Sequence, residues 1–502
     1  MGRRTKAAIF ADFTGGMNVD SSPTSLELNQ ALDLDNVILL PQGGFKKTNG
    51  NSEYNSTAMS SGAAVHGSGF YRNITEVEYM MQICGAKIFK SEFDGTMDDI
   101  TGAVTISTGQ DNIWSYTQMN DLAIFVGGNR STDVPLKWNG TGNAAILAGT
   151  PPVGKWCISA NNRLFIGNTV AAPSRINWSI LGNPEDFSGA GSGSQDVATN
   201  DGDQLIGACL LATDHLLVFK QNSIHELIIR TAPFPLFPLF SDIGAISNRA
   251  ILDVDGVCFF ITPEPRMKAT DGNSIVDFPD TFNAIWDGLN KSRLPYIQGV
   301  YDKKRRLVMW FCSNGASSTN DFCIAWDLDR KAWIKFSSGH NMNTAVMMQD
   351  TTIYGGGYDG KVYEIDDDST SNYASEGGDA IDAYWRSGWM DNDQMINMKH
   401  IPYVDLNFKT QDSGTFRFSY GYDFQSDRNT ASINMQQGGS LWGTGVWGSS
   451  SWGGTTDRTK LEHLKGNGKF FQFCIRNNND DEAFQFNRLS FPINTDAPYA
   501  LR

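Results

Sequence analysis

Two short apolar runs decide the fold, Leu307-Val308-Met309-Trp310-Phe311 and, after a polar stretch, Phe322-Cys323-Ile324-Ala325-Trp326. Each run is five residues long, and turn-forming Asn, Asp or Gly residues lie between the two. A short apolar run that turn residues bound is typical of a buried β-strand. The stretch therefore predicts two neighbouring strands of one sheet.

Similar runs recur through the first 365 residues, whereas amphipathic helical periodicity is nearly absent. They group into units of roughly 30 to 45 residues, the length range of a four-stranded propeller blade. The units span residues 69–100, 113–146, 156–187, 205–230, 250–278, 297–336 and 344–365. Asp-Gly steps, which favour two-residue hairpin turns, lie between apolar runs at Asp94-Gly95, Asp255-Gly256, Asp271-Gly272 and Asp359-Gly360.

We therefore predict an all-β chain whose residues 51–366 form a degenerate β-propeller. The sequence is compatible with six blades or with seven, because a strand from the N-terminal segment, residues 1–50, could complete one unit. That segment is expected to be extended and either to close the propeller or to dock elsewhere. Closing the ring matters because it leaves only short, protected sheet edges.

A second β domain is predicted after the propeller. Residues 367–379 are acidic and rich in Ser and Gly, which indicates a linker. Residues 380–502 contain strands with clean alternation, such as Thr415-Phe416-Arg417-Phe418-Ser419-Tyr420, and predict a smaller β-sandwich. Within this domain, residues 441–454 form a Trp/Gly-rich stretch that we expect to be a loop.

Composition narrows the function classes. The chain has 502 residues, 19% of them charged, with 51 Gly and 30 Phe, which excludes a largely disordered protein. Forty basic and 55 acidic residues give a net charge of −15, the wrong sign for a protein that wraps nucleic acid. We expect no signal peptide and no membrane-spanning segment, and we expect the seven cysteines to be buried free thiols.

Catalytic and cofactor motifs are missing from the sequence. There is no P-loop, no G-x-S-x-G elbow and no zinc-ligand spacing among the six histidines. The acidic runs Asp366-Asp367-Asp368 and Asp480-Asp481-Glu482 are expected to be solvated turns rather than catalytic pairs. The prediction is a protein that is not an enzyme and that holds no metal or cofactor.

Two aromatic clusters are candidate interfaces. Trp442, Trp447 and Trp452 either cover the surface of their own domain, contact another subunit, stack on sugars or touch a membrane. The stretch that holds Phe234, Phe237 and Phe240 also contains Pro235 and Pro238, so it cannot form a central strand. It either packs on its own blade or contacts a neighbour.

Several patches, in this order, resemble tail tubular protein B, the nozzle or hub group of short-tailed bacteriophages. They are Phe13-Thr14-Gly15-Gly16-Met17-Asn18, Pro41-Gln42-Gly43-Gly44-Phe45, Arg163-Leu164-Phe165-Ile166-Gly167, Gly182-Asn183-Pro184-Glu185-Asp186-Phe187, Leu217-Val218-Phe219-Lys220, Gly299-Val300-Tyr301-Asp302, Trp326-Asp327-Leu328 and Ala332-Trp333. The resemblance covers residues 9 to 366 in scattered patches. The order of the patches, rather than any one of them, carries the likeness.

The resemblance implies a structural virion protein, made in the host cytoplasm and located in the tail. It implies a homohexameric ring that continues the DNA channel from portal and adaptor proteins, retains the packaged double-stranded DNA and opens for DNA ejection, near tail fibre or spike proteins. An acidic surface would let DNA pass without sequence-specific binding, because it repels phosphates. The channel-lining residues, the gate and the adaptor contact are not indicated by the sequence.

Two alternatives stay open. A carbohydrate-binding or carbohydrate-cleaving propeller would act on host surface glycans and would need acids and aromatics that converge at the mouth of the ring. A monomeric, kelch-like interaction platform would need neither a ring of copies nor a catalytic pair.

Overall fold

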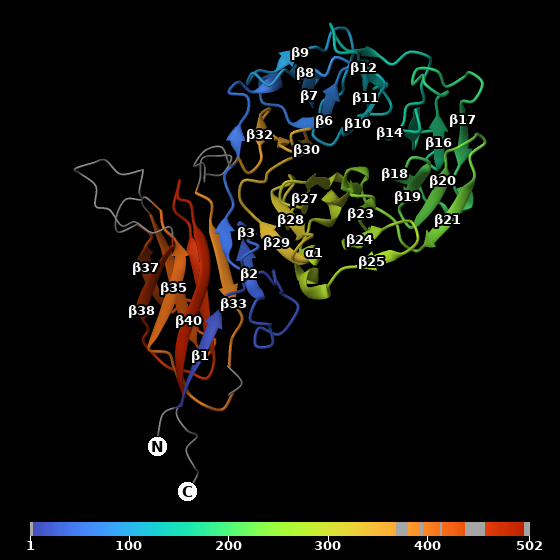
Figure 1. Ribbon diagram of the computed structural model, residues 1–502. Coiled ribbons are helices and arrows are strands. Elements are labelled where there is room, and N and C mark those ends of the chain that lie inside the picture. The colour runs from blue at the N-terminus through green and yellow to red at the C-terminus, as the bar shows by residue number, and fades with distance from the viewer. Residues whose placement is uncertain (1–3, 368–379, 392–394, 412–413, 437–456, 496–502) are drawn as a thin grey trace.

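The computed structural model describes residues 4–367, 380–391, 395–411, 414–436 and 457–495, which form two β units (Figure 1). The larger unit is a ring of four-stranded sheets, and the smaller one beside it is a sandwich of two sheets. The prediction of an all-β chain, with a β-propeller and a smaller β-sandwich, is confirmed. No helix in these ranges is long and apolar enough to cross a membrane.

Residues 65–336 form six blades, each an antiparallel sheet in simple chain order. The first three are β6 (Val65–Arg72), β7 (Glu78–Cys84), β8 (Lys87–Ser91), β9 (Asp98–Asp99); β10 (Trp114–Met119), β11 (Leu122–Gly127), β12 (Leu136–Trp138), β13 (Ala145–Ile146); and β14 (Trp156–Ala160), β15 (Arg163–Gly167), β16 (Arg175–Trp178), β17 (Gly193–Asp196). The next three are β18 (Leu205–Ala212), β19 (His215–Lys220), β20 (Ser223–Ile228), β21 (Leu236–Ser241); β22 (Leu252–Val254), β23 (Val257–Ile261), β24 (Met267–Thr270), β25 (Ile275–Asp277); and β26 (Gln298–Asp302), β27 (Leu307–Cys312), β28 (Phe322–Asp327), β29 (Ala332–Phe336).

A seventh blade closes the ring with a strand from the N-terminal side. It consists of β30 (Thr344–Met347), β31 (Ile353–Gly356), β32 (Val362–Glu364) and β5 (Ser52–Glu53). Glu53 pairs with Tyr363 in the antiparallel register of β5 and β32. The inner strand β30 contacts both β26 and β6, so the described strands between residues 52 and 364 make a closed seven-bladed ring. The sequence left open whether a strand from the N-terminal side closes the ring, and the structure contains such a strand.

The Asp-Gly steps turn hairpins where the sequence predicts them. All four lie between strands that pair with each other, in blades 1, 5 and 7. In blade 5, Asp255 (φ 53°) and Gly256 (φ 83°) both adopt the left-handed conformation between β22 and β23. Two consecutive residues with positive φ match the right-handed twist of the flanking strands, which explains the Asp-Gly preference.

Glycines in the inner strand of blade 1 let the next blade approach closely. A Cβ atom at Gly69 would lie 2.4 Å from the ring of Tyr116 in β10, and one at Gly67 would lie 2.9 Å from Trp114 Cβ. Neither contact is compatible with a larger residue unless a neighbour moves. Small residues at alternate positions of β6 therefore set the spacing of blades 1 and 2.

The sandwich is built from both ends of the chain. In one sheet the strands follow the order β3-β4-β40-β35-β38, and β1 and β34 also pair with β40. Its strands are β1 (Arg4–Phe10), β3 (Val37–Leu39), β4 (Phe45–Lys47), β34 (Lys399–His400), β35 (Tyr403–Lys409), β38 (Asp457–His463) and β40 (Gln485–Thr495). The other sheet follows β2 (Ala31–Asp35), β33 (Ala383–Ser387), β39 (Phe471–Asn477), β36 (Thr415–Tyr422) and β37 (Asn429–Asn434).

The structure thus places residues 4–47 inside the sandwich, rather than in an extended segment at the propeller. The long strand β40 needs partners on two sides, and β1 and β4 supply one of them, with Arg4 opposite Thr495 and Phe45 opposite Phe486. The closure strand β5 begins only at Ser52. The strands of residues 31–47 are three to five residues long, too short to show a recognisable alternation.

Aromatic rings from distant parts of the sequence fill the space between the two sheets. The ring centroid of Phe13 lies 4.9 Å from that of Trp385 and 5.5 Å from that of Phe45, and Phe45 lies 5.8 Å from Phe486. All four side chains are fully buried. Large buried rings of this kind contribute on the order of 2 kcal/mol each, so the N-terminal segment is part of the hydrophobic core of the sandwich.

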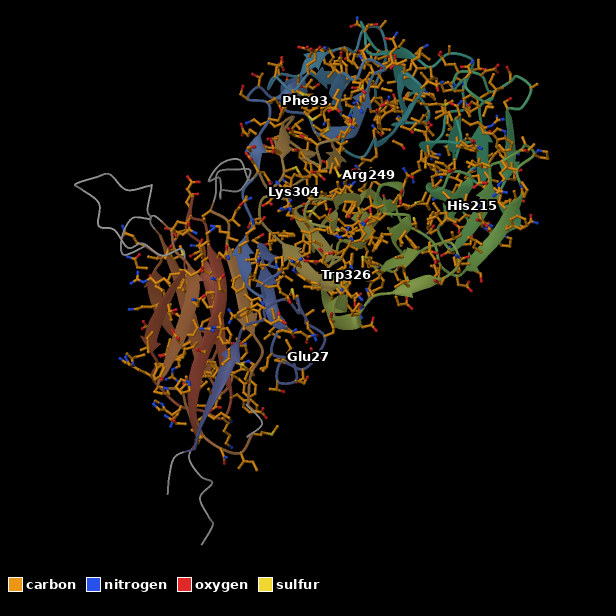
Figure 2. All side chains as sticks on the ribbon, in the orientation of Figure 1. Glu27, Phe93, His215, Arg249, Lys304 and Trp326 are labelled. Atoms are coloured by element: carbon orange, nitrogen blue, oxygen red, sulfur yellow. The ribbon has the colours of Figure 1, made fainter. Side chains whose placement is uncertain are left out.

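Helical structure is confined to short turns between strands. The described ranges contain the one-turn helix α1 (Asn283–Asp287) and the 3-10 turns η1 (Met59–Ser61), η2 (Thr199–Asp201), η3 (Asn248–Ala250), η4 (Asp280–Phe282) and η5 (Lys291–Tyr296). The 3-10 turn η3 lies just before blade 5 and leads into the centre of the ring, where the first candidate site is located (Figure 2).

Candidate functional site

Arg249 of η3 lies in the middle of the ring (Figure 2). The Nδ2 atom of Asn248 donates to Ser115 Oγ of blade 2, at 3.4 Å. Arg249 Nη1 donates to the carbonyl oxygen of Asn343 at 2.6 Å, and its Nη2 donates to the carbonyl oxygen of Tyr296 at 2.8 Å. Burial lowers the pKa of Arg249 to about 10. These bonds connect blades on opposite sides of the ring, so the centre at this level is filled by protein.

Arg293 and Asp111 form an ion pair at one mouth of the ring. Arg293 Nη1 lies 2.6 Å from Asp111 Oδ1, and the guanidinium stacks 4.0 Å from the centre of the Tyr296 ring. Glycoside hydrolysis canonically needs two carboxyl groups that flank the scissile bond, about 5 to 9.5 Å apart. Asp111 is one carboxylate and its Oδ1 atom is bonded to Arg293, so this ion pair by itself does not provide the two facing carboxyl groups.

The propeller and the sandwich meet at a polar junction. Lys335 of β29 lies with Nζ 2.8 Å from Asp33 Oδ1 and 3.8 Å from Asp35 Oδ2 of β2. The backbone N–H of Ser337 donates to Asp35 Oδ1 at 2.9 Å, and the Ser337 hydroxyl donates to Asp35 Oδ2 at 2.5 Å. One cation and two carboxylates, with Asp35 and Lys335 largely buried, therefore fix the outer strand of blade 6 to the sandwich.

Asp35 is the most perturbed carboxyl group of the junction. Burial raises its pKa to about 6, against the opposing effects of Lys335 and of the two hydrogen bonds from Ser337. The nearby carboxylate of Asp33 raises it further. The junction therefore contains a group that changes charge near neutral pH.

Backbone contacts extend the junction along β29. The N–H of Met17 donates to the carbonyl oxygen of Trp333 at 3.0 Å, and the N–H of Asn36 donates to that of Lys335 at 3.0 Å. A Cβ atom at Gly16, which has φ +72°, would lie 2.7 Å from Ala332 Cβ. The N-terminal segment thus pairs with the propeller through backbone atoms, which requires a glycine at the closest point.

A second polar contact, at Arg305, lies beside the junction at Lys335. The guanidinium of Arg305 forms ion pairs with Asp302 and Asp366, and Asp366 Oδ1 also accepts hydrogen bonds from Thr48 Oγ1 at 2.7 Å and from the N–H of Asn49 at 2.6 Å. The Asp366 side chain is only 6% exposed. The expectation of a solvated acidic turn was therefore wrong for Asp366, because Arg305 and the two residues that follow β4, Thr48 and Asn49, compensate its burial.

The other acidic positions vary in exposure. Asp367 is also buried, contrary to the expectation of a solvated turn, and Asp368 lies outside the described residues. Asp480 and Asp481 are exposed as predicted, whereas Glu482 is half-buried and its Oε2 atom accepts hydrogen bonds from the N–H of Thr415 and from Asn477 and Asn479. Among the described residues no group of three or more His, Cys, Asp or Glu side chains could hold a metal ion.

Two cavities flank the closing blade. One, of about 460 Å³, lies in the notch between blades 6 and 7 and the sandwich, where Lys46, Lys304 and Asp350 contribute to the lining. The other, of about 700 Å³, lies beside blade 1 and is lined by small and apolar residues such as Met59 and Phe89. The notch contains charges of both signs, so it does not select a ligand by net charge alone.

The three predicted interface residues that the structure describes differ in burial. Phe234 is buried, with its ring centroid 4.8 Å from that of Trp178, so it belongs to the core between blades 3 and 4. Phe237 is 48% exposed and Phe240 is half-buried, both on β21, the outermost strand of blade 4. Pro238 fits there because an edge strand needs no donor on its outer side. Trp442, Trp447 and Trp452 lie outside the described residues.

The negative charge is concentrated on the propeller. Residues 51–366 contain 23 basic and 33 acidic side chains, whereas residues 1–50 and 380–502 together contain 17 and 18. The propeller therefore carries a net charge of −10 and the sandwich segments one of −1. The negative charge is therefore distributed unevenly along the chain, which the total charge by itself does not indicate.

Sequence reasoning missed the junction residues. Lys335, Asp33 and Asp35 are common residue types in short strands, and the two acids are separated from Lys335 by some 300 positions. The available signal was the pair of acids in residues 31–35, a stretch that otherwise alternates with Ala and Leu. A charged residue on a strand that is otherwise apolar indicates either an edge or a buried ion pair.

Comparisons with known proteins give fold-level likeness at low similarity. No protein-family model matches the chain, and no curated protein matches it. The WD40 β-propeller domain of Doa1 aligns with a TM-score of 0.42 and 10% identity over 65% of this chain and 100% of its own. YCF48 from Cyanidioschyzon merolae gives 0.42 and 10% over 63% and 98%, and a catalytically inactive virginiamycin B lyase from Staphylococcus aureus gives 0.40 and 10% over 62% and 97%. These likenesses are too weak to carry an argument, and the fold rests on the strand pairings.

Proposed function

We propose that this chain is a structural, non-catalytic subunit of a short bacteriophage tail. Copies of it form the nozzle ring at the distal end of the tail, next to the portal-adaptor proteins and the tail fibres or spikes. The ring continues the DNA channel, retains the packaged genome and opens for ejection. The fold itself supports a less specific role, because a β-propeller offers a surface to which other molecules can bind.

One observation carries the proposal. Two of the patches that resemble the nozzle group, residues 13–18 and residues 326–333, are more than 300 positions apart in the sequence and touch in the folded chain. Met17 donates a backbone hydrogen bond to Trp333, and Gly16 abuts Ala332. The two patches resemble the same family, and they also form the contact between the propeller and the sandwich. Because this contact fixes how the propeller is oriented on the sandwich, the likeness supports a common architecture.

The charge distribution supports a role beside DNA. A net charge of −10 on the propeller repels phosphates, so a duplex would move past such a surface without many bound contacts to break. The centre of the propeller is filled around Arg249, so in this proposal the channel runs between copies and not through a single ring of blades.

Imaging of assembled particles tests the proposal. Particles that carry this chain with a fused tag should show six-fold density for the tag at the distal tail. Particles assembled without the chain should lose their DNA to added nuclease. A tag that is found elsewhere, or full protection of the genome without the chain, would contradict the nozzle role.

The glycan alternative predicts a different outcome. Purified protein incubated with host surface polysaccharide would release shorter chains if the propeller were a hydrolase. We expect no change in polysaccharide length, because the described mouth of the ring presents Asp111 in an ion pair with Arg293. A monomeric platform would remain monomeric by light scattering even when the adaptor is present.

A further inference from the structure

The strand β1 is an open edge of the sandwich. It pairs with β40 over seven residues, and in the described part of the chain it pairs with no other strand (Figure 1). Among the described residues, the backbone groups of residues 7–10 bond to β40 alone. Alternate residues of an antiparallel strand turn their N–H and C=O groups away from the partner strand. One side of β1 therefore presents unpaired backbone donors and acceptors.

A groove of about 450 Å³ follows this edge. Ala7, Ala8 and Ile9 all line it. Because successive residues of a strand point to opposite faces, a groove that touches three in a row follows the backbone edge and not one face of the sheet. The opposite wall comes from residues 24–28 and from residues 387–391, which continue β33 of the other sheet. The groove therefore lies between the margins of the two sheets.

The walls of the groove are apolar and acidic. Ile9 is 62% exposed and Leu28 is 57% exposed, so both offer apolar surface to a partner. The charged residues of the described lining are Glu27, which Figure 2 labels, and Asp391, and this lining contains no Lys or Arg. An extended segment that alternates apolar and basic residues complements such walls in both shape and charge.

The opposite edge of the same sheet is protected against strand addition. β38 forms that edge, and four of its seven residues are Asp, Arg, Lys or Glu. Lys460 lies opposite the fully buried Leu406, so its position is on the inward face, where a charge opposes the addition of another strand. Residues 7–10 of β1 contain neither a charge nor a proline. The β1 edge thus lacks the features that keep a free edge unpaired.

We propose that the β1 edge binds an extended, basic and apolar segment of another protein, which pairs with β1 as an added strand. Main-chain hydrogen bonds supply the affinity, and the groove selects the alternate side chains. Lys or Arg residues of the segment are attracted by Glu27 and Asp391. The proposal goes beyond the nozzle role and does not depend on it, because strand addition requires only this edge of the sandwich.

Binding of three synthetic peptides to the full chain tests the proposal. The first, KVTIKVTIK, alternates polar and apolar residues, and the second, EVTIEVTIE, has Glu in place of each Lys. We expect the first to bind about tenfold more tightly in fluorescence anisotropy, because only its charges complement the groove. The third is the basic peptide methylated at every backbone nitrogen. It should not bind, because it lacks the main-chain donors of an added strand.

Three results would overturn the proposal. They are a dissociation constant above about 1 mM for the basic peptide, equal binding of the basic and acidic peptides, and undiminished binding of the methylated peptide. Hydrogen exchange then locates the bound peptide. Residues 7–10 should gain protection and residues 457–463 should not. Protection of residues 457–463 alone would place the added strand at the other edge and contradict the proposal.

Substitutions in the far wall of the groove leave β1 itself intact. Glu27→Lys should weaken binding of the basic peptide about tenfold and strengthen that of the acidic one, because it reverses a charge of the groove. Leu28→Ser should weaken binding of both, since it removes an apolar contact. The matched controls are Glu264→Lys, at an exposed position of blade 5, and Ile146→Ser, at a 56% exposed position of blade 2.

The control variants should bind both peptides as the wild type does. Equal effects of the control and groove substitutions would reject the groove as the binding site. Imaging of assembled particles decides the nozzle role separately. A six-fold ring of chains that do not bind the basic peptide would therefore reject this proposal and leave the proposed function intact.

Discussion

Lys335 on the outer strand of blade 6 lies with its Nζ atom 2.8 Å from Asp33 Oδ1 of the sandwich, across 302 positions of sequence. The same ammonium faces Asp35, which accepts two hydrogen bonds from Ser337. This arrangement ties the two units of the chain together. Its consequences can be measured on the isolated protein.

Replacement of Lys335 by Met should loosen the junction. The change leaves Asp33 and Asp35 without their cation, and removing one partner of a buried ion pair costs about 3 kcal/mol. Calorimetry should show a lower melting temperature and a sandwich transition that separates from that of the propeller. Lys331→Met, at an exposed position of the same hairpin, is the control and should change little. Unchanged coupling in Lys335→Met would mean that the backbone contacts suffice.

The stability of the junction should depend on pH through Asp35. Its pKa is about 6 in the folded chain against an ordinary value of 3.8, so the folded state binds more protons between these values. Stability from this group is therefore greatest below about pH 4 and falls as pH rises through 6, by up to about 3 kcal/mol. Chemical denaturation from pH 4 to 7 should show this slope in the wild type and a flatter one in Asp35→Asn. Equal slopes would contradict the assignment.

Gly69→Ala should destabilise the propeller. The new Cβ atom would lie 2.4 Å from the Tyr116 ring, and overpacking of this kind costs about 1–3 kcal/mol. Gly288→Ala is the matched control, because its nearest contact is 3.4 Å and its φ is −76°. Urea denaturation should separate the two variants. A stable Gly69→Ala protein would mean that blades 1 and 2 can shift apart.

The closure strand should contribute to cooperative unfolding. Tyr54→Pro removes the backbone donor that bonds to the carbonyl oxygen of Val362, next to the pairing of Glu53 with Tyr363. Tyr54→Ala loses the same ring but keeps the donor. We expect a broader thermal transition and faster proteolysis in Tyr54→Pro than in Tyr54→Ala. Equal behaviour of the two variants would assign the effect to the lost ring.

The cysteines should be unreactive in the folded protein. All seven are buried, and burial raises the pKa of Cys84 to about 11 and that of Cys157 and Cys474 to about 12. Because thiolates are the reactive species, iodoacetamide at pH 8 should modify none of them until the chain unfolds. Mass spectrometry counts the adducts. Rapid labelling of any one thiol would indicate local opening of its blade.

Local sequence patterns were enough to predict the strands of the blades, but they did not predict the strands of the N-terminal segment. Leu307 to Phe311 and Phe322 to Trp326 became the central strands β27 and β28, because five apolar residues between turns fit a buried strand in any blade. Residues 31–47 form strands of three to five residues, whose partners lie beyond residue 380. No local pattern indicates a partner at such a distance.

Acidic residues show the same limit of prediction from local sequence. Asp480 and Asp481 are exposed as expected, whereas Asp366 is buried against Arg305 and two residues of the sandwich. The three residues are alike in sequence context. What separates them is which surface packs against them, and this depends on how the propeller meets the sandwich.

Residue type, short-range periodicity and counting were enough to predict the strands of the blades, the hairpin turns and the excess of acid on residues 51–366. The closure of seven blades through Ser52 and Glu53, the single sandwich built from both chain ends and the contact of Lys335 with Asp33 and Asp35 appear only in the folded chain. These features are contacts between residues hundreds of positions apart. They arise because sheet edges and buried charges must find partners, wherever in the chain those partners lie.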